Sequence, residues 1–189
     1  MLKTMIDIEN LFERDEEMLK ILRAAQSLDL PDWWICAGFV RSKVWDSLHG
    51  FQNKTPLPDV DVIYFDTEIV SEHREKVLEE QLRLNLPGIP WSVKNQARMH
   101  VKNHSSPYTS ANDAMSKFPE TATALGVKLD EHDRVKLAAP LGVDDLFSMT
   151  IAPTPYFQKT DARMAIYQLR VLKKNWSKTW PKVIVSTQN

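Results

Sequence analysis

The stretch WWICAGFVRSKVWDSLHGFQNKTPLPDVDVIYFD, residues 33–66, holds two short apolar runs separated by a helix-like segment and a proline-rich turn. The first run, residues 34–36, has the composition of a strand and stops at Gly38, where the missing side chain permits a sharp turn. Apolar residues then recur at helical spacing, and Gly50 is suited to end that helix. The stretch predicts a strand, a turn, a helix and a second strand.

The second predicted strand begins with two aspartates, Asp59 and Asp61, which are two residues apart and therefore share one face of the strand. Carboxylates held together beside an apolar core repel each other, and a cation neutralises that repulsion. Carboxylate oxygens on a rigid strand suit Mg2+, which keeps water and substrate phosphates as its other ligands. We predict a metal site for Mg2+ at Asp59 and Asp61. In the alternative, they only cap and solvate the strand entrance, with Arg41 as a salt-bridge partner.

Six blocks of the chain resemble a bacterial family of nucleotidyltransferase-like proteins, within the superfamily of polymerase beta and the CCA-adding enzymes. The blocks are WWICAGFVR, WDSLHG, DVDVIYFD, WSVKNQARMH, FPETATA and PTP, between Leu28 and Val185. In CCA-adding enzymes, two glycines, any residue and Val-Arg-Asp precede an Asp-x-Asp strand; here Ala37 replaces the first glycine and Ser42 the aspartate. The resemblance implies an α/β (α+β) nucleotidyltransferase-like fold, with a central mixed sheet, helices chiefly on one face and a C-terminal α+β extension.

The resemblance also implies a reaction, the transfer of a nucleotidyl group from a nucleoside triphosphate to an acceptor hydroxyl, with Asp59 and Asp61 as catalytic metal ligands. The N-terminus of the helix after the glycine turn would receive the triphosphate, because free N–H groups and the helix dipole attract anions. The predicted nucleotide-binding residues are those that open this helix: Gly38, Phe39, Arg41, Ser42 and Lys43.

A third carboxylate is not evident in the sequence. Active members of the superfamily usually carry one on a strand beside the Asp-x-Asp strand, where it commonly serves as the base. Residues 89–99 are predicted to form that strand, which offers Ser92, Lys94, Asn95 or Gln96. Without the acid, one metal ligand and the base are lost; Asp66 could substitute only if its strand turned back. An alternative function is therefore a catalytically weak or inactive module that binds Mg2+ and nucleotide.

Length, charge and cysteine content set limits on the architecture and the partners. The 189 residues, 43% of them hydrophobic, fit one domain over 1–189, with a core of about 28–100 and an extension of about 101–189. A net charge of -1 gives no overall field for nucleic acid. The single cysteine, Cys36, excludes an internal disulfide. The longest apolar run, residues 33–40, is too short to cross a bilayer, and no leader opens the chain. We expect a cytoplasmic protein without a membrane partner.

Outside the central stretch, helices are predicted over residues 7–27, 71–85 and 156–176, short helices over 110–118 and 119–126, a β-hairpin over 127–137 and a last strand over 183–185. Asp144 is expected to cap a short helix, or to form a second metal site with Asp145.

Two further features have two interpretations each. His100 and His104 have the spacing of metal ligands on a helix, but Asn103 and the residues 105–107 favour a turn. The lysines and tryptophans of residues 173–182 could form a nucleic-acid surface on which bases stack, or the lysine stems could cover the rings at a helix C-terminus.

Overall fold

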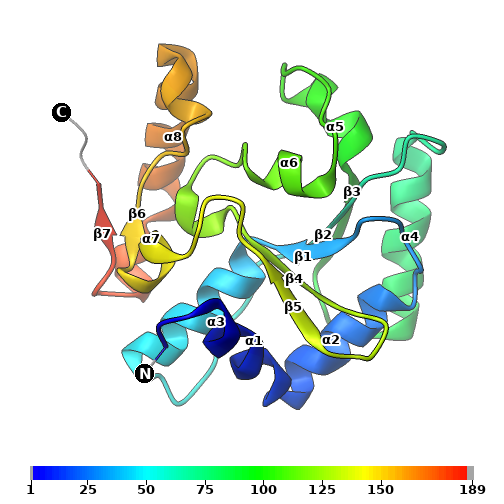
Figure 1. Cartoon of the computed structure of the whole chain (residues 1–189), viewed down its shortest axis with the longest axis horizontal. Helices are drawn as coiled ribbons and strands as arrows, with labels where there is room; N and C mark the ends of the chain where they lie inside the picture. Colours follow the sequence, from blue (N-terminus) through cyan, green and yellow to red (C-terminus); the bar gives the residue numbers. More distant parts are fainter. Residues whose placement is uncertain (1, 187–189) are drawn as a thin grey trace.

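A five-stranded mixed sheet forms the centre of the computed structural model, which describes residues 2–186 (Figure 1). Its strands are β1 (Trp34–Cys36), β2 (Val60–Tyr64), β3 (Trp91–Asn95), β4 (Gly126–Leu129) and β5 (Val135–Ala138), in the order β3-β2-β1-β4-β5. β2 and β3 are parallel, and the other neighbouring pairs are antiparallel. The predicted hairpin is present as β4 and β5, so both halves of the chain contribute strands to one sheet.

Helices lie chiefly on one face of this sheet, as predicted. They are α1 (Met5–Glu13), α2 (Glu16–Gln26), α3 (Gly38–His49) and α4 (Glu72–Asn85). Because strand side chains alternate between faces, Ile35 and Val62 join the main core with these helices. Cys36 and Ile63 point to the other face, where they pack in a smaller cluster with two residues of α6 (Ala111–Met115).

The remaining elements surround the edge of the sheet. They are α5 (Gln96–Lys102), η1 (Thr121–Thr123), α7 (Asp144–Phe147), β6 (Thr150–Ile151), η2 (Phe157–Lys159), α8 (Asp161–Lys174), α9 (Trp176–Thr179) and β7 (Ile184–Val185). β6 and β7 form a separate parallel pair, which includes the predicted last strand. Within residues 2–186, none of the helices has the length and apolar character needed to span a membrane.

Side-chain caps end two predicted elements earlier than expected. The predicted helix over 7–27 is two helices, because Asp15 Oδ1 accepts hydrogen bonds from the N–H groups of Glu17 and Met18 and so starts α2. The predicted strand over 89–99 ends at Asn95, whose side chain accepts from the Ala97 N–H and starts α5. Asp144 is not a cap: it is the first residue of α7, and Val143 precedes it without a side-chain bond.

Two large apolar residues of the helices are exposed, Val77 of α4 at 36% and Leu169 of α8 at 67%. On α4 the buried positions include Glu75 and Glu79. Arg98 of α5 forms two hydrogen bonds to Glu75, and the N–H of Val93 donates to Glu79. Partners from neighbouring elements therefore bury two carboxylates that a hydropathy pattern would assign to the surface.

Candidate functional site

Asp59 directly precedes β2, and Asp61 is the second residue of that strand. Across the sheet, Asp61 is paired with Cys36 of β1 and with Ser92 of β3. Burial raises the pKa of the Asp61 carboxyl, the charge of Asp59 raises it further, and a hydrogen bond with Ser92 opposes both effects. A carboxylate in these surroundings is stabilised by an added cation.

The turn between β1 and α3 brings backbone close to these carboxylates. Ala37 has φ 55 and ψ -114, a conformation that favours glycine, and its N–H donates to the carbonyl of Leu125. A Cβ atom added to Gly38 would lie 3.7 Å from Arg41 Nη2 and 3.9 Å from Asp59 Oδ1. The first turn of α3, the Arg41 guanidinium and the Asp59 carboxylate therefore border one space.

Three tryptophans enclose the guanidinium of Arg41. Its central carbon lies 5.3 Å from the ring centroid of Trp45, 5.2 Å from that of Trp176 and 5.5 Å from that of Trp180. Burial lowers the pKa of Arg41 to about 10, so the side chain remains charged at neutral pH. Its Nε is buried without a hydrogen-bond partner in the part of the chain that the structure describes. Arg41 is a desolvated cation that can receive an anion.

The burial of two tryptophan rings decides whether the C-terminal Lys/Trp segment, residues 173–182, can stack on bases. Trp176 and Trp180 are only 5% and 4% exposed. Rings in this position hold Arg41 and cannot stack on the bases of a nucleic acid. Of the two interpretations of residues 173–182, the one in which bases stack on these two rings is therefore not supported.

A cavity of about 230 Å³ joins the predicted residues to side chains that sequence reasoning missed. Gly38, Arg41, Asp59 and Asp61 line it together with Arg170 and Lys174 of α8. The other lining residues are Ala37, Pro58, Phe118, Pro119, Thr123 and Trp176. Three cations face two carboxylates here, which is a suitable charge balance for a metal-bound polyphosphate.

Arg170 is held at the edge of this cavity by Glu120, which is fully buried. The Nε of Arg170 donates to Glu120 Oε1 at 2.7 Å, and its Nη2 donates to Oε2 at 3.3 Å. The hydroxyl of Thr123 donates to the same carboxylate at 2.9 Å. Glu120 and Thr123 belong to the FPETATA block, but no spacing in the sequence pairs that block with a residue 50 positions later.

Three of the predicted nucleotide-binding side chains lie elsewhere. Phe39 is fully buried, with its ring centroid 5.4 Å from that of Phe12 in α1. Ser42 is buried and does not line the cavity, and the ammonium group of Lys43 pairs with Asp15. Residues three apart share a helix face, so the face that presents Gly38 and Arg41 turns these others away. The expected contact of Lys43 with phosphate is not supported.

The weaker candidates for metal sites are also apart from the cavity. Asp66 accepts hydrogen bonds from the N–H groups of Glu68 and Ile69 in a turn, so it does not supply a third acid. His100 lies in α5, whereas His104 lies beyond its end with φ 48, so one helix does not carry both. Across residues 2–186, no three or more His, Cys, Asp or Glu side chains are grouped as they would be around a metal ion.

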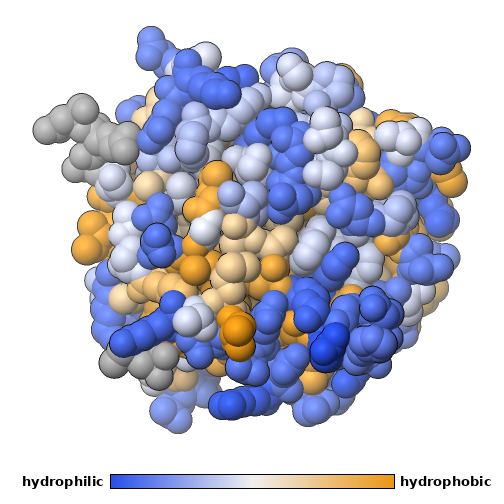
Figure 2. Space-filling model, viewed as in Figure 1, coloured by the Kyte–Doolittle hydropathy of each residue, from blue (hydrophilic) through white to orange (hydrophobic). Residues whose placement is uncertain are grey.

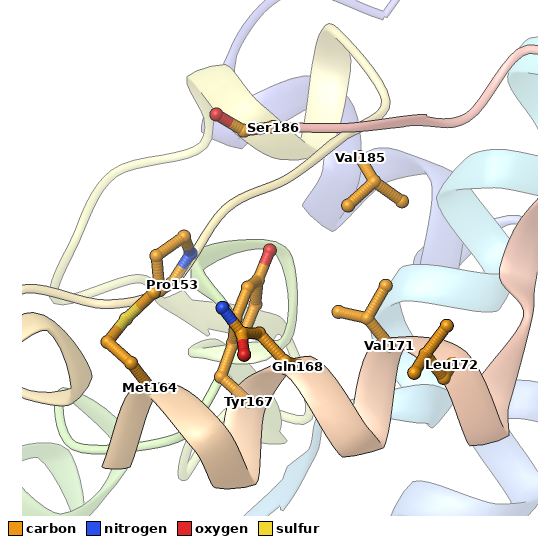
Figure 3. A pocket seen from close by; sticks show the side chains of 8 residues that line it. All are labelled: Pro153, Met164, Tyr167, Gln168, Val171, Leu172, Val185 and Ser186. Carbon is orange, nitrogen blue, oxygen red and sulfur yellow. The ribbon is translucent and has the colours of Figure 1, made fainter. Parts of the chain in front are cut away.

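A larger cavity of about 390 Å³ lies between α8 and β7 (Figure 3). Its lining consists of Pro153, Met164, Tyr167, Gln168, Val171, Leu172, Val185 and Ser186. In Figure 3 Val171 and Val185 approach from opposite sides, and none of the eight labelled residues is charged. This lining does not suit a triphosphate. On the face shown in Figure 2, residues of intermediate to mildly apolar hydropathy lie near the centre, and many hydrophilic residues lie around them.

Comparisons with known proteins agree with this geometry. A family described as nucleotidyltransferase matches residues 23–185. A solved NMR structure described as revealing a CCA-adding enzyme head domain is 37% identical, with a TM-score of 0.89 over 99% of this chain and 98% of that chain. No curated protein matches.

Two apo forms of a tRNA-processing enzyme are more distant relatives in structure. They are 17% and 16% identical, with TM-scores of 0.51 and 0.53 over 90% and 88% of this chain. The matched regions are 43% and 44% of those longer chains. At this identity they show a common fold.

Proposed function

The chain belongs to this nucleotidyltransferase family, and we propose that it is a Mg2+-dependent enzyme that transfers a nucleotidyl group from a nucleoside triphosphate to an acceptor hydroxyl. The observation that carries the proposal is the cavity where carboxylates, a helix N-terminus and buried or anchored cations meet. Its working residues are Asp59, Asp61, Gly38, Arg41, Arg170 and Lys174.

Asp59 and Asp61 are suited to hold Mg2+ in this cavity. They supply oxygen ligands, and the burial that raises the pKa of Asp61 makes a neutralising cation favourable. When bound, Mg2+ would offset negative charge on the phosphates and the carboxylates. Arg41 would contact the triphosphate beside Gly38, with its guanidinium fixed by the tryptophan rings.

The transfer itself needs positioning and charge stabilisation more than covalent help from the protein. The acceptor oxygen forms a bond to the α-phosphorus, and the bond from that phosphorus to the α–β bridging oxygen breaks. Pyrophosphate leaves with the electron pair, and the hydroxyl proton passes to water. Arg41, Arg170 and Lys174 would stabilise the charge that develops on the leaving pyrophosphate.

One observation favours a second candidate, a module that binds Mg2+ and nucleotide without turnover. The residue of β3 beside Asp61 is Ser92, and the described lining of the cavity has no third acid. A base for the acceptor hydroxyl is therefore missing from the expected position.

Two measurements separate the candidates. The first is calorimetric binding of α,β-methylene analogues of the four ribonucleoside triphosphates, with and without Mg2+. The second is pyrophosphate release from the natural triphosphates in the presence of small hydroxyl acceptors and RNA. The test variant is Asp59→Asn with Asp61→Asn, and the matched charge control is Glu131→Gln in the exposed β4–β5 turn.

Release of pyrophosphate that needs Mg2+ and is lost only in the double variant supports the enzyme. Binding that needs Mg2+ and the aspartates, without release under any condition, supports the binding module. If wild-type protein binds no analogue at millimolar concentration, both candidates are wrong and the aspartates serve the fold alone.

A further inference from the structure

A further cavity, of about 330 Å³ and distinct from the one in Figure 3, adjoins the candidate site. It is called the second cavity below, and the candidate site is the first. The second cavity lies between α8 with η2 on one side and the segment from the end of α5 to Pro119 on the other; in Figure 1 this places it between α5, α6 and α8. The two cavities share Phe118, Pro119 and Arg170. A molecule in the second cavity would therefore be next to one bound at Asp59 and Asp61.

The lining of the second cavity combines cations with aromatic rings. The cations are Lys102, Lys117, Arg163 and Arg170, and the rings are those of Tyr108, Phe118, Tyr156 and Phe157. Asn103, His104 and Ile166 complete the lining with Pro119. None of these described lining residues is an Asp or Glu, in contrast to the first cavity.

Two of these cations, Arg163 and Lys117, are held against rings at the wall of the cavity. The guanidinium carbon of Arg163 lies 3.9 Å from the centroid of the Tyr156 ring, and its Nη2 donates to the Tyr156 hydroxyl at 2.8 Å. The ammonium of Lys117 lies 4.9 Å from the centroid of Tyr108. Such pairs also occur as structure alone. Here they line a hollow without carboxylates that opens onto a candidate phosphoryl-transfer site.

Arg163 differs from its cationic neighbours in its partners. Lys102 pairs with Glu72, Lys117 with Asp113 and Arg170 with Glu120. The guanidinium of Arg163 contacts the ring and the hydroxyl of Tyr156. Its planar guanidinium keeps donors for a phosphate, to which arginine binds through two parallel hydrogen bonds.

We propose that this second cavity binds the acceptor, and that the acceptor is a nucleoside phosphate whose base contacts the partly exposed rings of Phe118, Tyr156 and Phe157 and whose phosphate contacts Arg163. Aromatic rings beside cations recognise a planar base linked to an anion. The volume is at the small end of the range for ligand sites, about 300–1,000 Å³, which suits one nucleotide. This role rests on the proposed function, because the acceptor hydroxyl attacks the α-phosphorus of a triphosphate in the first cavity.

The same chemistry has two sources, a free nucleotide and the last nucleotide of a single-stranded RNA. Calorimetry with AMP and with a six-nucleotide RNA ending in a 3′ hydroxyl distinguishes them. Each titration is made with and without a saturating Mg2+ complex of the α,β-methylene analogue. The variants are Arg163→Gln and Lys102→Gln, and the matched control is Lys20→Gln, which removes an exposed charge from α2.

We expect AMP or the RNA to bind wild-type protein with the analogue present, and Arg163→Gln to weaken this binding about tenfold while the affinity for the analogue is unchanged. Lys102→Gln, at an exposed position where the lysine pairs with the exposed Glu72, is expected to weaken it severalfold, and Lys20→Gln to leave it unchanged. The stronger of the two ligands identifies the source.

Three outcomes overturn the inference. The first is that neither probe binds while the analogue does, which leaves the proposed function intact. The second is displacement of AMP by the analogue, which would place both ligands in one cavity. The third is equal binding by wild type and by both test variants. If the analogue itself does not bind, the proposed function fails and the acceptor role fails with it.

Discussion

Asp61 combines two properties at the scale of the residue: it is the carboxylate best placed for a metal, and its charge opposes folding. Burial and Asp59 raise its pKa, so its contribution to stability is complete below the ordinary value of 3.8 and is lost as pH rises through the raised value. Asp61→Asn removes that charge. We expect it to raise the unfolding free energy in EDTA at pH 7 by about 0.5–2 kcal/mol, with a smaller gain near pH 4.

Urea unfolding of wild type and Asp61→Asn at both pH values measures this difference. Added Mg2+ should stabilise the wild type and leave the variant unchanged, because ligands stabilise only the state that binds them. Asp144→Asn, at an exposed position in α7, is the control. If Asp61→Asn is less stable than wild type in EDTA, the charge of Asp61 does not oppose folding and this interpretation is wrong.

Substitutions at the adjacent positions Ala37 and Gly38 are expected to have different effects, one on stability and the other on binding. Ala37 has φ 55, where a Cβ is unfavourable, so Ala37→Gly is expected to stabilise the fold by about 1 kcal/mol as relief of strain outweighs lost chain entropy. At Gly38 a Cβ would make only ordinary contacts at 3.7 and 3.9 Å. Gly38→Ala should therefore leave the melting temperature within about 2 °C of wild type, which corresponds to about 0.5–1 kcal/mol.

Binding of the triphosphate analogue gives the second half of the comparison. The methyl group of Gly38→Ala would stand between Arg41 and Asp59, in the space assigned to phosphate, and we expect affinity to fall at least about tenfold, or 1.4 kcal/mol. Ala37→Gly is the matched control and should keep its affinity. Unchanged binding by Gly38→Ala would show that the N-terminus of α3 does not contact the triphosphate.

At the scale of the element, the local sequence pattern predicts well where several signals agree. The strand–turn–helix–strand unit and the hairpin are present because alternation, helical spacing and turn residues agree there. Prediction was wrong where a polar side chain ended an element: Asp15 divides the first helix, and Asn95 ends β3. A cap is identified with certainty only once its backbone partners are known, since Asp and Asn side chains can bond to several nearby backbone groups or to solvent.

The tryptophan enclosure of Arg41 makes a prediction at this scale, because it joins α3 to the segment after α8. The indole N–H of Trp180 donates to Asp46 Oδ1 at 2.8 Å. Trp180→Phe removes that bond from a buried carboxylate and is expected to destabilise the fold by about 1–3 kcal/mol. A phenyl ring also makes a weaker cation–π contact with Arg41 than an indole ring does, so analogue binding should weaken by about 2- to 30-fold, from cation–π energies of about 0.5–2 kcal/mol.

Trp91→Phe provides the matched comparison. Trp91 is also buried, and its indole N–H also donates, to the carbonyl of Leu86. We expect similar destabilisation in thermal unfolding but unchanged affinity for the analogue. Equal losses of affinity in both variants would mean that the enclosure acts through general stability and does not position Arg41.

At the scale of the whole molecule, the candidate site was only partly predictable. One stretch of the sequence holds Gly38, Arg41, Asp59 and Asp61. The alternation of the strand and the spacing of the helix are enough to predict that they lie close together. The other half of the lining, which includes Arg170, belongs to residues 118–176. Their approach depends on tertiary packing, including the bond from Thr154 to the carbonyl of Phe118, and no short-range pattern encodes it. The same packing creates the second cavity.

Two carboxylates with low exposure, one partly buried and one buried, also join separate segments of the molecule. Asp15, the N-cap of α2, accepts hydrogen bonds from Lys43 of α3 and from Lys54; these bonds outweigh burial and lower its pKa to about 2. Glu79 of α4 is similarly held at a pKa of about 2, where bonds from Lys76, Lys94 and the Val93 N–H outweigh burial. Lowered values mean stability that is present above the ordinary values of 3.8 and 4.5 and is lost as pH falls toward 2.

We therefore expect the unfolding free energy to decline between about pH 5 and pH 2, with about 1–2 kcal/mol from each carboxylate after solvent screening. Urea titrations across this range test the expectation. Asp15→Asn and Glu79→Gln should each lower stability at pH 7 and flatten the decline, because the lost contribution no longer titrates. Glu131→Gln, which alters an exposed turn, should follow the wild-type curve. If either variant keeps the full wild-type slope, the carboxylate replaced in that variant does not contribute the stability that its contacts indicate.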